Sequence, residues 1–267
     1  MRRRVVAGVG VTEWPGRLPA VVALHGFTGD GADFAALAPR LGRRVVALDL
    51  LGHGLSPAPV ARAPYALERQ LGRLERALDR LRLPDVVLLG YSLGARVALH
   101  LALRRRVLGL VLIGGTPGLS DEAERAARRE EDARRAEAVA RDGAPAFLAA
   151  WRAQPLIATQ ARAPARLQAI LRRGRARLTA HGLARTLEAL SPGVVPPLWD
   201  ALPGLRSPTL LVTGADDAKF EAIARDVLAR APRARHVSVP GAGHAPHLER
   251  PAACGWALRA WLAAASR

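Results

Sequence analysis

The sequence predicts an α/β fold, a doubly wound and mostly parallel sheet with an inserted helical lid. Short runs rich in Val and Leu recur along the chain and end at Gly, His or Asp. Such runs are typical of strands buried on both faces, as in parallel sheets. Segments with helical spacing alternate with the runs, which indicates strand–helix–strand connections. With 267 residues, of which 50% are hydrophobic, the chain is large enough for one such domain with an insertion.

The elements are expected in a regular order. Residues 1–16 have a basic start and a short alternating apolar run, which we interpret as an N-terminal strand. Further strands are expected at residues 20–24, 44–50, 85–89, 108–113, 209–213 and 236–239. The helices of the sheet domain are expected at residues 32–41, 65–81, 93–103, 220–230 and 252–265.

The alternation stops at Thr116 and resumes after Pro203. Residues 121–141 are predicted to form a charged helix, because acidic residues occupy its first turn and Glu–Arg pairs lie four residues apart. Further helical stretches, broken by prolines, continue to about residue 202. We therefore predict an α/β core made of residues 1–115 and 204–267, and a helical lid made of residues 116–203.

The chain is strongly basic, with 40 Lys and Arg residues against 23 Asp and Glu, a net charge of +17. It has one lysine, Lys219, and no asparagine, which indicates a compositional bias toward arginine. Aromatic residues make up 4% of the chain, and no stacking stripe or zinc spacing is present, so we expect no nucleic-acid partner. Within the lid, however, residues 143–187 hold eight arginines and no acidic residue, which favours an anionic substrate.

The single cysteine, Cys254, cannot form an internal disulfide, so nothing in the sequence requires an oxidising compartment. The basic N-terminus is followed by too short an apolar run for a signal peptide, without a small-residue cleavage site. No run approaches the roughly 18 apolar residues of a membrane span. We expect a soluble, cytoplasmic protein that does not bind membranes; the sequence does not indicate its oligomeric state.

Residues 90–94 read Gly-Tyr-Ser-Leu-Gly and stand between a predicted buried strand and a predicted helix. This is the setting of a nucleophile elbow, in which Ser92 is held above the sheet edge on a sharp turn. The backbone N–H of Leu93 would then point toward a developing oxyanion. A serine hydroxyl needs a neighbouring base to take its proton, so partners are expected further along the chain.

Candidate partners follow the last two strands, where open α/β sheets build their sites. The acid is Asp216 or Asp217, and the base is His244, with His247 as the minor alternative. His25-Gly26-Phe27 follows an earlier strand, and the N–H of Phe27 is expected to join that of Leu93 in an oxyanion hole. His53, in a Gly-His-Gly turn, is expected to be structural.

Together these motifs resemble the α/β-hydrolase superfamily along the whole chain. The hydrolase pattern places the acid three residues after the glycine that ends the strand, which selects Asp217. Five further segments are similar to the 2-succinyl-6-hydroxy-2,4-cyclohexadiene-1-carboxylate synthase family of menaquinone biosynthesis. They are residues 24–30 (LHGFTGD), 90–96 (GYSLGAR), 114–128 (GGTPGL leading to ERAAR), 151–156 (WRAQPL) and 217–220 (DAKF).

The resemblance implies a lyase that eliminates pyruvate from 2-succinyl-5-enolpyruvyl-6-hydroxy-3-cyclohexene-1-carboxylate. Ser92, polarised by His244 and Asp217, would act as a base and abstract the proton α to the ring carboxylate. The Phe27 and Leu93 N–H groups would hold the charge that builds up. The implied reaction needs neither a metal nor a cofactor.

The resemblance also implies substrate-binding residues for this small polycarboxylate. Arginine is suited to the task because its planar guanidinium binds a carboxylate at two places. Arg96 matches the family's arginine after the elbow, and Arg128 matches that of the first lid helix. For the arginine in the second half of the lid we select Arg177, with Arg172 and Arg173 as alternatives. The other matching pocket residues are Tyr91 and Trp151, while Arg152 stands where the family can have a tyrosine.

Two other functions compete with this interpretation. A serine carboxylesterase or a C–C bond hydrolase would use the same three residues on the same fold. A basic nucleic-acid-binding protein is the more distant alternative, motivated by the charge alone. Release of pyruvate distinguishes the lyase from the hydrolases, and salt-dependent binding to DNA would support the second alternative.

Overall fold

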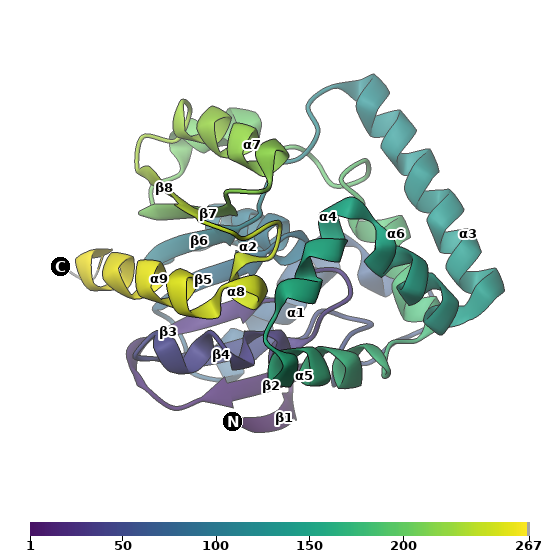
Figure 1. The fold of residues 1–267 in the computed structure, drawn as a ribbon, viewed down its shortest axis with the longest axis horizontal. Helices are drawn as coiled ribbons and strands as arrows, with labels where there is room; N and C mark the ends of the chain where they lie inside the picture. The colour runs from purple at the N-terminus through teal and green to yellow at the C-terminus, as the bar shows by residue number, and fades with distance from the viewer. Residues whose placement is uncertain (266–267) are drawn as a thin grey trace.

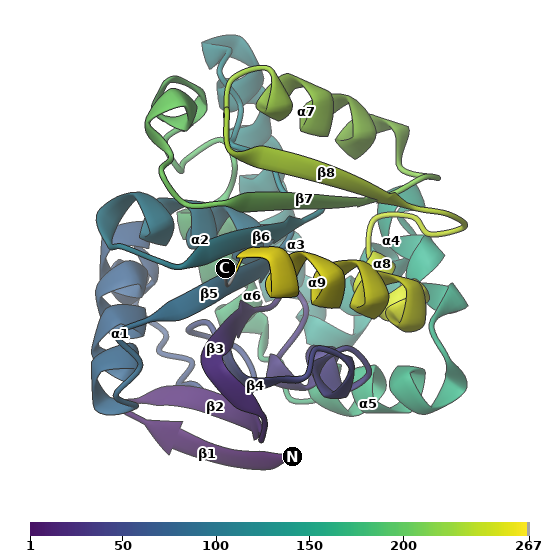
Figure 2. The ribbon, with the colours of Figure 1, turned by 90° about the vertical axis from the view of Figure 1, so that its left-hand side faces the viewer.

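A computed structural model describes residues 1–265. A central sheet of eight strands has the order β1-β2-β4-β3-β5-β6-β7-β8. Its strands from β3 to β8 are parallel to one another, and β1 and β2 are antiparallel at one edge. Figure 2 shows this order from one end of the sheet to the other, with α9 in front. The strands are β1 (Arg2–Val6), β2 (Val9–Trp14), β3 (Arg17–Leu24), β4 (Arg43–Leu48), β5 (Val86–Tyr91), β6 (Gly109–Ile113), β7 (Thr209–Gly214) and β8 (Ala234–Val239).

Both faces of the sheet are covered, which explains why the strands read as continuous apolar runs. On one face, Leu88 and its neighbours pack against residues of α1, α2 and α7. On the other face, Leu89 and its neighbours pack against α9 and the segment after β3. The helices of the core are α1 (Leu67–Arg80), α2 (Leu93–Arg104), α7 (Ala218–Leu228), α8 (Pro246–Glu249) and α9 (Pro251–Ala265), with the 3-10 helix η3 (Ala63–Tyr65).

Two predicted elements differ from the structure. The expected N-terminal strand is a hairpin, because Ala7 and Gly8 both adopt positive φ and turn the chain between β1 and β2. The helix expected at residues 32–41 is instead two 3-10 helices, η1 (Gly31–Ala35) and η2 (Ala38–Arg40). Pro39 explains part of this difference, because proline lacks the N–H that an α-helix would need there.

The lid lies between β6 and β7 and packs beside one end of the sheet (Figure 1). Its charged helix begins at Glu122, where the Asp121 carboxylate accepts a hydrogen bond from the Glu124 N–H at 2.8 Å. It continues beyond the expected end, across a kink at Gly143, and packs against α6 around a small separate core. The lid elements are α3 (Glu122–Ala153), α4 (Pro155–Ala158), η4 (Thr159–Arg162), α5 (Ala165–Arg175), α6 (Ala180–Leu190) and η5 (Trp199–Gly204).

Within residues 1–265, no helix combines the length and the apolar character needed to cross a bilayer. The same residues contain no group of three or more His, Cys, Asp or Glu side chains arranged to hold a metal ion. Cys254 lies in the first turn of α9 and is buried, and burial raises the pKa of its thiol to about 12. Its thiol is therefore protonated and inert at neutral pH.

Candidate active site

Ser92 occupies a sharp turn between β5 and α2. Its backbone has φ 51° and ψ −108°, a conformation that non-glycine residues rarely adopt and that is often found at functional sites. The turn is tight because a Cβ on Gly90 would lie 2.3 Å from the Gly94 carbonyl oxygen. A Cβ on Gly94 would lie 2.2 Å from the carbonyl oxygen of Leu24. The two glycines therefore let the strand, the turn and the helix approach each other closely enough to present Ser92 at the sheet edge.

The close packing around Gly94 predicts a loss of stability on substitution, and a second glycine in a helix provides the control. Gly94→Ala is expected to lower the free energy of unfolding by about 3 kcal/mol or more, because the clashing atoms belong to the backbone of β3. Gly72→Ala, in the middle of α1, meets only the tip of the Arg76 side chain at 3.4 Å. That variant is expected to raise the free energy of unfolding by about 0.5–1 kcal/mol, since alanine favours the helix. Urea denaturation of both variants measures the difference, and equal effects would contradict the packing argument.

Asp217 and His244 complete a hydrogen-bonded chain with Ser92. The His244 Nδ1 lies 2.8 Å from the Asp217 carboxylate, and its Nε2 lies 3.1 Å from the Ser92 Oγ. A carboxylate can only accept, so Nδ1 carries the proton and Nε2 is free to accept the serine proton. Asp217 is fixed in turn as the N-cap of α7, accepting from the Phe220 N–H at 3.3 Å. Both partners are almost fully buried, which holds the imidazole in one orientation.

The alternative acid and base considered from the sequence, Asp216 and His247, do not contact Ser92. Asp216 points outward and forms an ion pair with Arg162, with both side chains 42% exposed. His247 is buried between the rings of Tyr91 and Phe34, at centroid distances of 4.4 and 5.5 Å. Neither of its ring nitrogens has a hydrogen-bond partner. Burial lowers its pKa to about 3, so His247 is a neutral packing residue.

Two buried histidines brace the loop that carries Phe27. The His25 Nε2 accepts from the Leu50 N–H at 3.0 Å, so its Nδ1 carries the proton and donates to the Gly26 carbonyl at 2.7 Å. His53 contacts the carbonyl oxygens of Leu51 and Phe27. Burial, followed by the nearby His25, lowers the pKa of His53 to about 4, so it is neutral. The loop is therefore held rigidly where Phe27 faces Ser92.

A cavity of about 150 Å³ lies between the sheet edge and the lid. Ser92 and His244 open into it beside Phe27 and Leu93, the residues expected to form the oxyanion hole. Its cationic side chains come from three places: α2, the first lid helix and the start of α7. They are Arg96, Arg128 and Lys219.

Arg96 is the most deeply buried of these cations. Its guanidinium donates to the Leu190 carbonyl at 3.1 Å, and its Nε has no hydrogen-bond partner. Burial, and then the nearby charge of Arg128, lower its pKa to about 10, so it remains charged at neutral pH. A buried cation with unused donors beside a second cation favours an anion.

Arg128 is held in place by an acidic side chain that also lines the cavity. Its Nε donates to Asp132 at 2.8 Å, and Arg135 donates to the other oxygen of the same carboxylate at 2.8 Å. Asp132 is 1% exposed, so it offsets part of the positive charge while no substrate is bound. Asp132 is not among the site residues predicted from the sequence. Its position four residues after Arg128, on the same helix face, was the available signal.

Aromatic side chains form the wall of the cavity next to Ser92. The rings of Phe27 and Trp151 are 5.0 Å apart and nearly perpendicular, and Phe147 packs against both. Tyr91, which was expected to contact substrate, lies instead beneath the site, where its hydroxyl accepts from Gln160 at 3.1 Å. Its ring is 5.5 Å from that of His244, so it packs behind the imidazole.

Comparison with known proteins agrees with this geometry. Residues 19–251 match the model of the α/β-hydrolase fold family. The chain is 39% identical to a putative 2-succinyl-6-hydroxy-2,4-cyclohexadiene-1-carboxylate synthase of Bacillus subtilis, covering 90% of this chain and 88% of that one. It is 37% identical to the synthase of that name in Salmonella paratyphi C, covering 88% of this chain and 90% of the relative. The chain belongs to the 2-succinyl-6-hydroxy-2,4-cyclohexadiene-1-carboxylate synthase family.

The fold of this synthase family is shared in detail. The structure of MenH from S. aureus superposes with a TM-score of 0.89 at 26% identity, covering 96% of this chain and 99% of that one. The α/β-hydrolase fold predicted from the elbow and its partners, with its mostly parallel sheet, is thereby confirmed. The family membership predicted from the five segments is confirmed as well.

The arginine selected for the second half of the lid, Arg177, and its two alternatives do not line the cavity around Ser92 in this structure. Arg177 is exposed in the turn after α5 and does not line the cavity around Ser92. Arg172 lines a neighbouring cavity of similar volume, about 160 Å³, and Arg173 is exposed. Arg175 lines the same neighbouring cavity, where it donates to Gln160 at 2.6 Å, and its buried Nε has no hydrogen-bond partner among residues 1–265. Because α5 ends at Arg175, helical spacing no longer holds at Arg177.

Proposed function

We propose that this chain catalyses the reaction named by its relatives, with Ser92, His244 and Asp217 as its catalytic residues. The reaction eliminates pyruvate from 2-succinyl-5-enolpyruvyl-6-hydroxy-3-cyclohexene-1-carboxylate, a step of menaquinone biosynthesis in the cytoplasm. The observation that carries the proposal is that the hydrogen-bonded serine opens into a cavity lined by Arg96 and Arg128. A substrate with three carboxylates needs such fixed cations, whereas a neutral ester does not.

The change in bonding decides which proton is removed. The substrate has a 3-ene and carries its leaving group on C5, whereas the product is a 2,4-diene. The proton must therefore leave C2, the carbon that bears the succinyl ketone. From the sequence we expected removal of the proton α to the ring carboxylate, and the positions of the double bonds correct that expectation.

The residues then supply a balanced set of steps. Ser92 Oγ takes the C2 proton while its own proton passes to His244 Nε2, and the Asp217 carboxylate stabilises the resulting imidazolium. The electron pair from C2–H forms the C2=C3 bond, the C3=C4 pair shifts to C4=C5, and the C5–O bond breaks. The leaving group departs as the enolate of pyruvate and becomes pyruvate when it is protonated on carbon.

Charge builds up during this sequence on the succinyl ketone oxygen. The backbone N–H groups of Phe27 and Leu93 would receive it, since both residues line the cavity beside Ser92. Arg96 and Arg128 would bind carboxylates and orient the ring. At about 150 Å³ the cavity is smaller than the ~300–1,000 Å³ of typical ligand sites, so the lid must move outward when substrate binds.

An assay of the purified protein tests the proposal directly. We expect it to release pyruvate from the enolpyruvyl substrate, measured by coupling to lactate dehydrogenase, in step with formation of the conjugated diene. p-Nitrophenyl acetate, supplied in parallel, is expected to turn over far more slowly. Brisk ester hydrolysis without pyruvate release would replace the lyase proposal with a carboxylesterase.

A further inference from the structure

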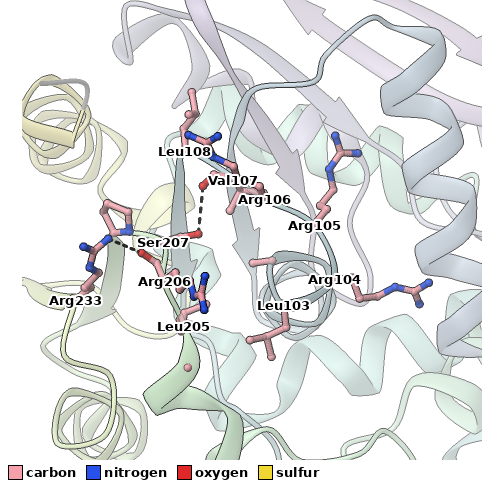
Figure 3. A pocket seen from close by; sticks show the side chains of 13 residues that line it. Leu103, Arg104, Arg105, Arg106, Val107, Leu108, Leu205, Arg206, Ser207 and Arg233 are labelled. Atoms are coloured by element: carbon pink, nitrogen blue, oxygen red, sulfur yellow. Dashed lines mark hydrogen bonds between the residues drawn. The ribbon is translucent and has the colours of Figure 1, made fainter.

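A second hollow lies at the N-terminal ends of β6, β7 and β8, whereas Ser92 lies at the C-terminal end of β5. It has a volume of about 620 Å³ and is lined by three chain segments, at residues 102–108, 204–208 and 233 (Figure 3). Five of its lining residues are arginines and none is acidic. We call it the arginine groove, after Arg104, Arg105, Arg106, Arg206 and Arg233.

Most of these arginines lack a carboxylate partner. Arg106 and Arg206 are exposed, and within the described part of the chain their guanidinium groups make no hydrogen bond or ion pair. Among residues 1–265, Arg233 donates only to the carbonyl oxygen of Arg206, at 2.8 Å. Within the same range, Arg105 donates only to the carbonyl oxygen of Pro84, at 3.4 Å. Their charges repel one another across the groove, and an anion placed there would relieve that repulsion.

Arg104 is the exception and sets the edge of the groove. It pairs with Glu68 at 2.5 Å and with Glu75 at 3.6 Å, both on α1. Figure 3 shows Arg104 and Arg105 extending to one side, with Arg206 and Arg233 on the other. The uncompensated charge therefore lies over the loops that lead into β6, β7 and β8.

The floor of the groove is fixed and partly apolar. The Ser207 hydroxyl donates to the Val107 carbonyl at 3.2 Å and ties the loop before β7 to the loop before β6. Val107 and Leu205 are buried beneath it, and Leu103 is 36% exposed. A rigid floor holds the surrounding arginines at set spacings, which lowers the ordering cost of binding.

We propose that the arginine groove binds a small molecule that carries two or more linked phosphates. Linked phosphates place several charges within a short span, and each guanidinium can bind two phosphate oxygens at once. The hollow suits a compact ligand better than a nucleic-acid duplex, because it is a concavity between three loops. The apolar floor leaves room for an organic group, such as a nucleoside, attached to the phosphates.

Titration calorimetry in about 0.15 M salt tests this proposal, with inorganic triphosphate and ATP as probes. The double variant Arg106→Ala/Arg206→Ala is expected to weaken binding of both probes at least about tenfold, since two charged contacts are lost. The matched control is Arg69→Ala/Arg76→Ala, which removes two exposed arginines of α1 that do not line the groove. This control is expected to change the Kd by less than about twofold. Pyruvate release by all variants is expected to stay at the level of the unmodified protein.

Four results would overturn the proposal. The first is that neither inorganic triphosphate nor ATP binds the unmodified protein. Equal weakening in the groove variant and in the α1 control would show attraction to net charge alone. Dependence of binding on Arg96 rather than on Arg106 and Arg206 would place the phosphates in the cavity of Ser92. Tighter binding of single-stranded oligonucleotides, increasing with their length, would identify the groove as part of a nucleic-acid surface.

Discussion

Ser92→Ala is expected to lower the kcat for pyruvate release by about 10³-fold or more, because the proposed mechanism assigns to Ser92 the removal of the C2 proton. The variant should keep its fold, since the Ser92 hydroxyl is bonded only to His244 and faces the cavity. Steady-state kinetics with the enolpyruvyl substrate measures the loss, and thermal unfolding verifies the fold. Turnover close to that of the unmodified protein would contradict the catalytic role of Ser92.

Ser191 provides a matched control in the same cavity. Its hydroxyl accepts from the Gly193 N–H at 3.0 Å and does not contact His244. Ser191→Ala is therefore expected to change kcat by less than about fivefold, since it loses one local hydrogen bond. A large loss in this variant would show that polar groups of the cavity act together rather than through Ser92.

Isotopic substitution separates a serine base from a serine nucleophile. If Ser92 removes the C2 proton in the slow step, substrate deuterated at C2 should react more slowly, and substrate deuterated at C1 should not. Mass spectrometry of enzyme quenched during turnover should show no adduct on Ser92. An acyl adduct would instead assign the chain to the hydrolases that share its fold.

The sheet and the residues around Ser92 were predictable because strong local constraints fix them. Burial on both faces turned the strands into continuous apolar runs, such as that of β5. The glycines around Ser92 marked a turn that nothing larger could form. The strand ends that meet at one side of the sheet limited the acid to Asp216 or Asp217 and favoured His244 as the base, and the hydrolase pattern then selected Asp217. In each case a few adjacent residues determine the local structure.

The remaining features depend on contacts between distant segments. Arg175 and Arg177 are both arginines near the end of α5, and only the packing of Leu167 and Leu171 against the core shows which one faces inward. The spacing of those leucines, continued by one helical turn, reaches Arg175 and was the overlooked signal. The arginine groove could not be foreseen, because its three segments are far apart in sequence.

Replacing Arg96 is expected to have the second largest effect. Arg96→Ala should lower kcat/KM by about 10²-fold, which corresponds to roughly 2.7 kcal/mol of lost charged hydrogen bonding. The guanidinium is buried, carries an unpartnered Nε and stays protonated because its pKa is about 10. We expect both a higher KM and a lower kcat, since the same contact binds the carboxylate and orients the ring.

Two further variants show whether substrate binding depends on the two-point contact of the Arg96 guanidinium or on its positive charge alone. Arg96→Lys keeps a cation but binds a carboxylate at one point, so it should recover only part of the activity lost in Arg96→Ala. Arg177→Ala removes an exposed arginine that lies outside the cavity and should change kcat/KM by less than about threefold. If Arg177→Ala lowered kcat/KM as much as Arg96→Ala, the result would indicate that the lid closes over the substrate in an arrangement that brings Arg177 inward. Since the proposed function expects the cavity to enlarge when substrate binds, this comparison tests whether Arg177 reaches the substrate in the bound state.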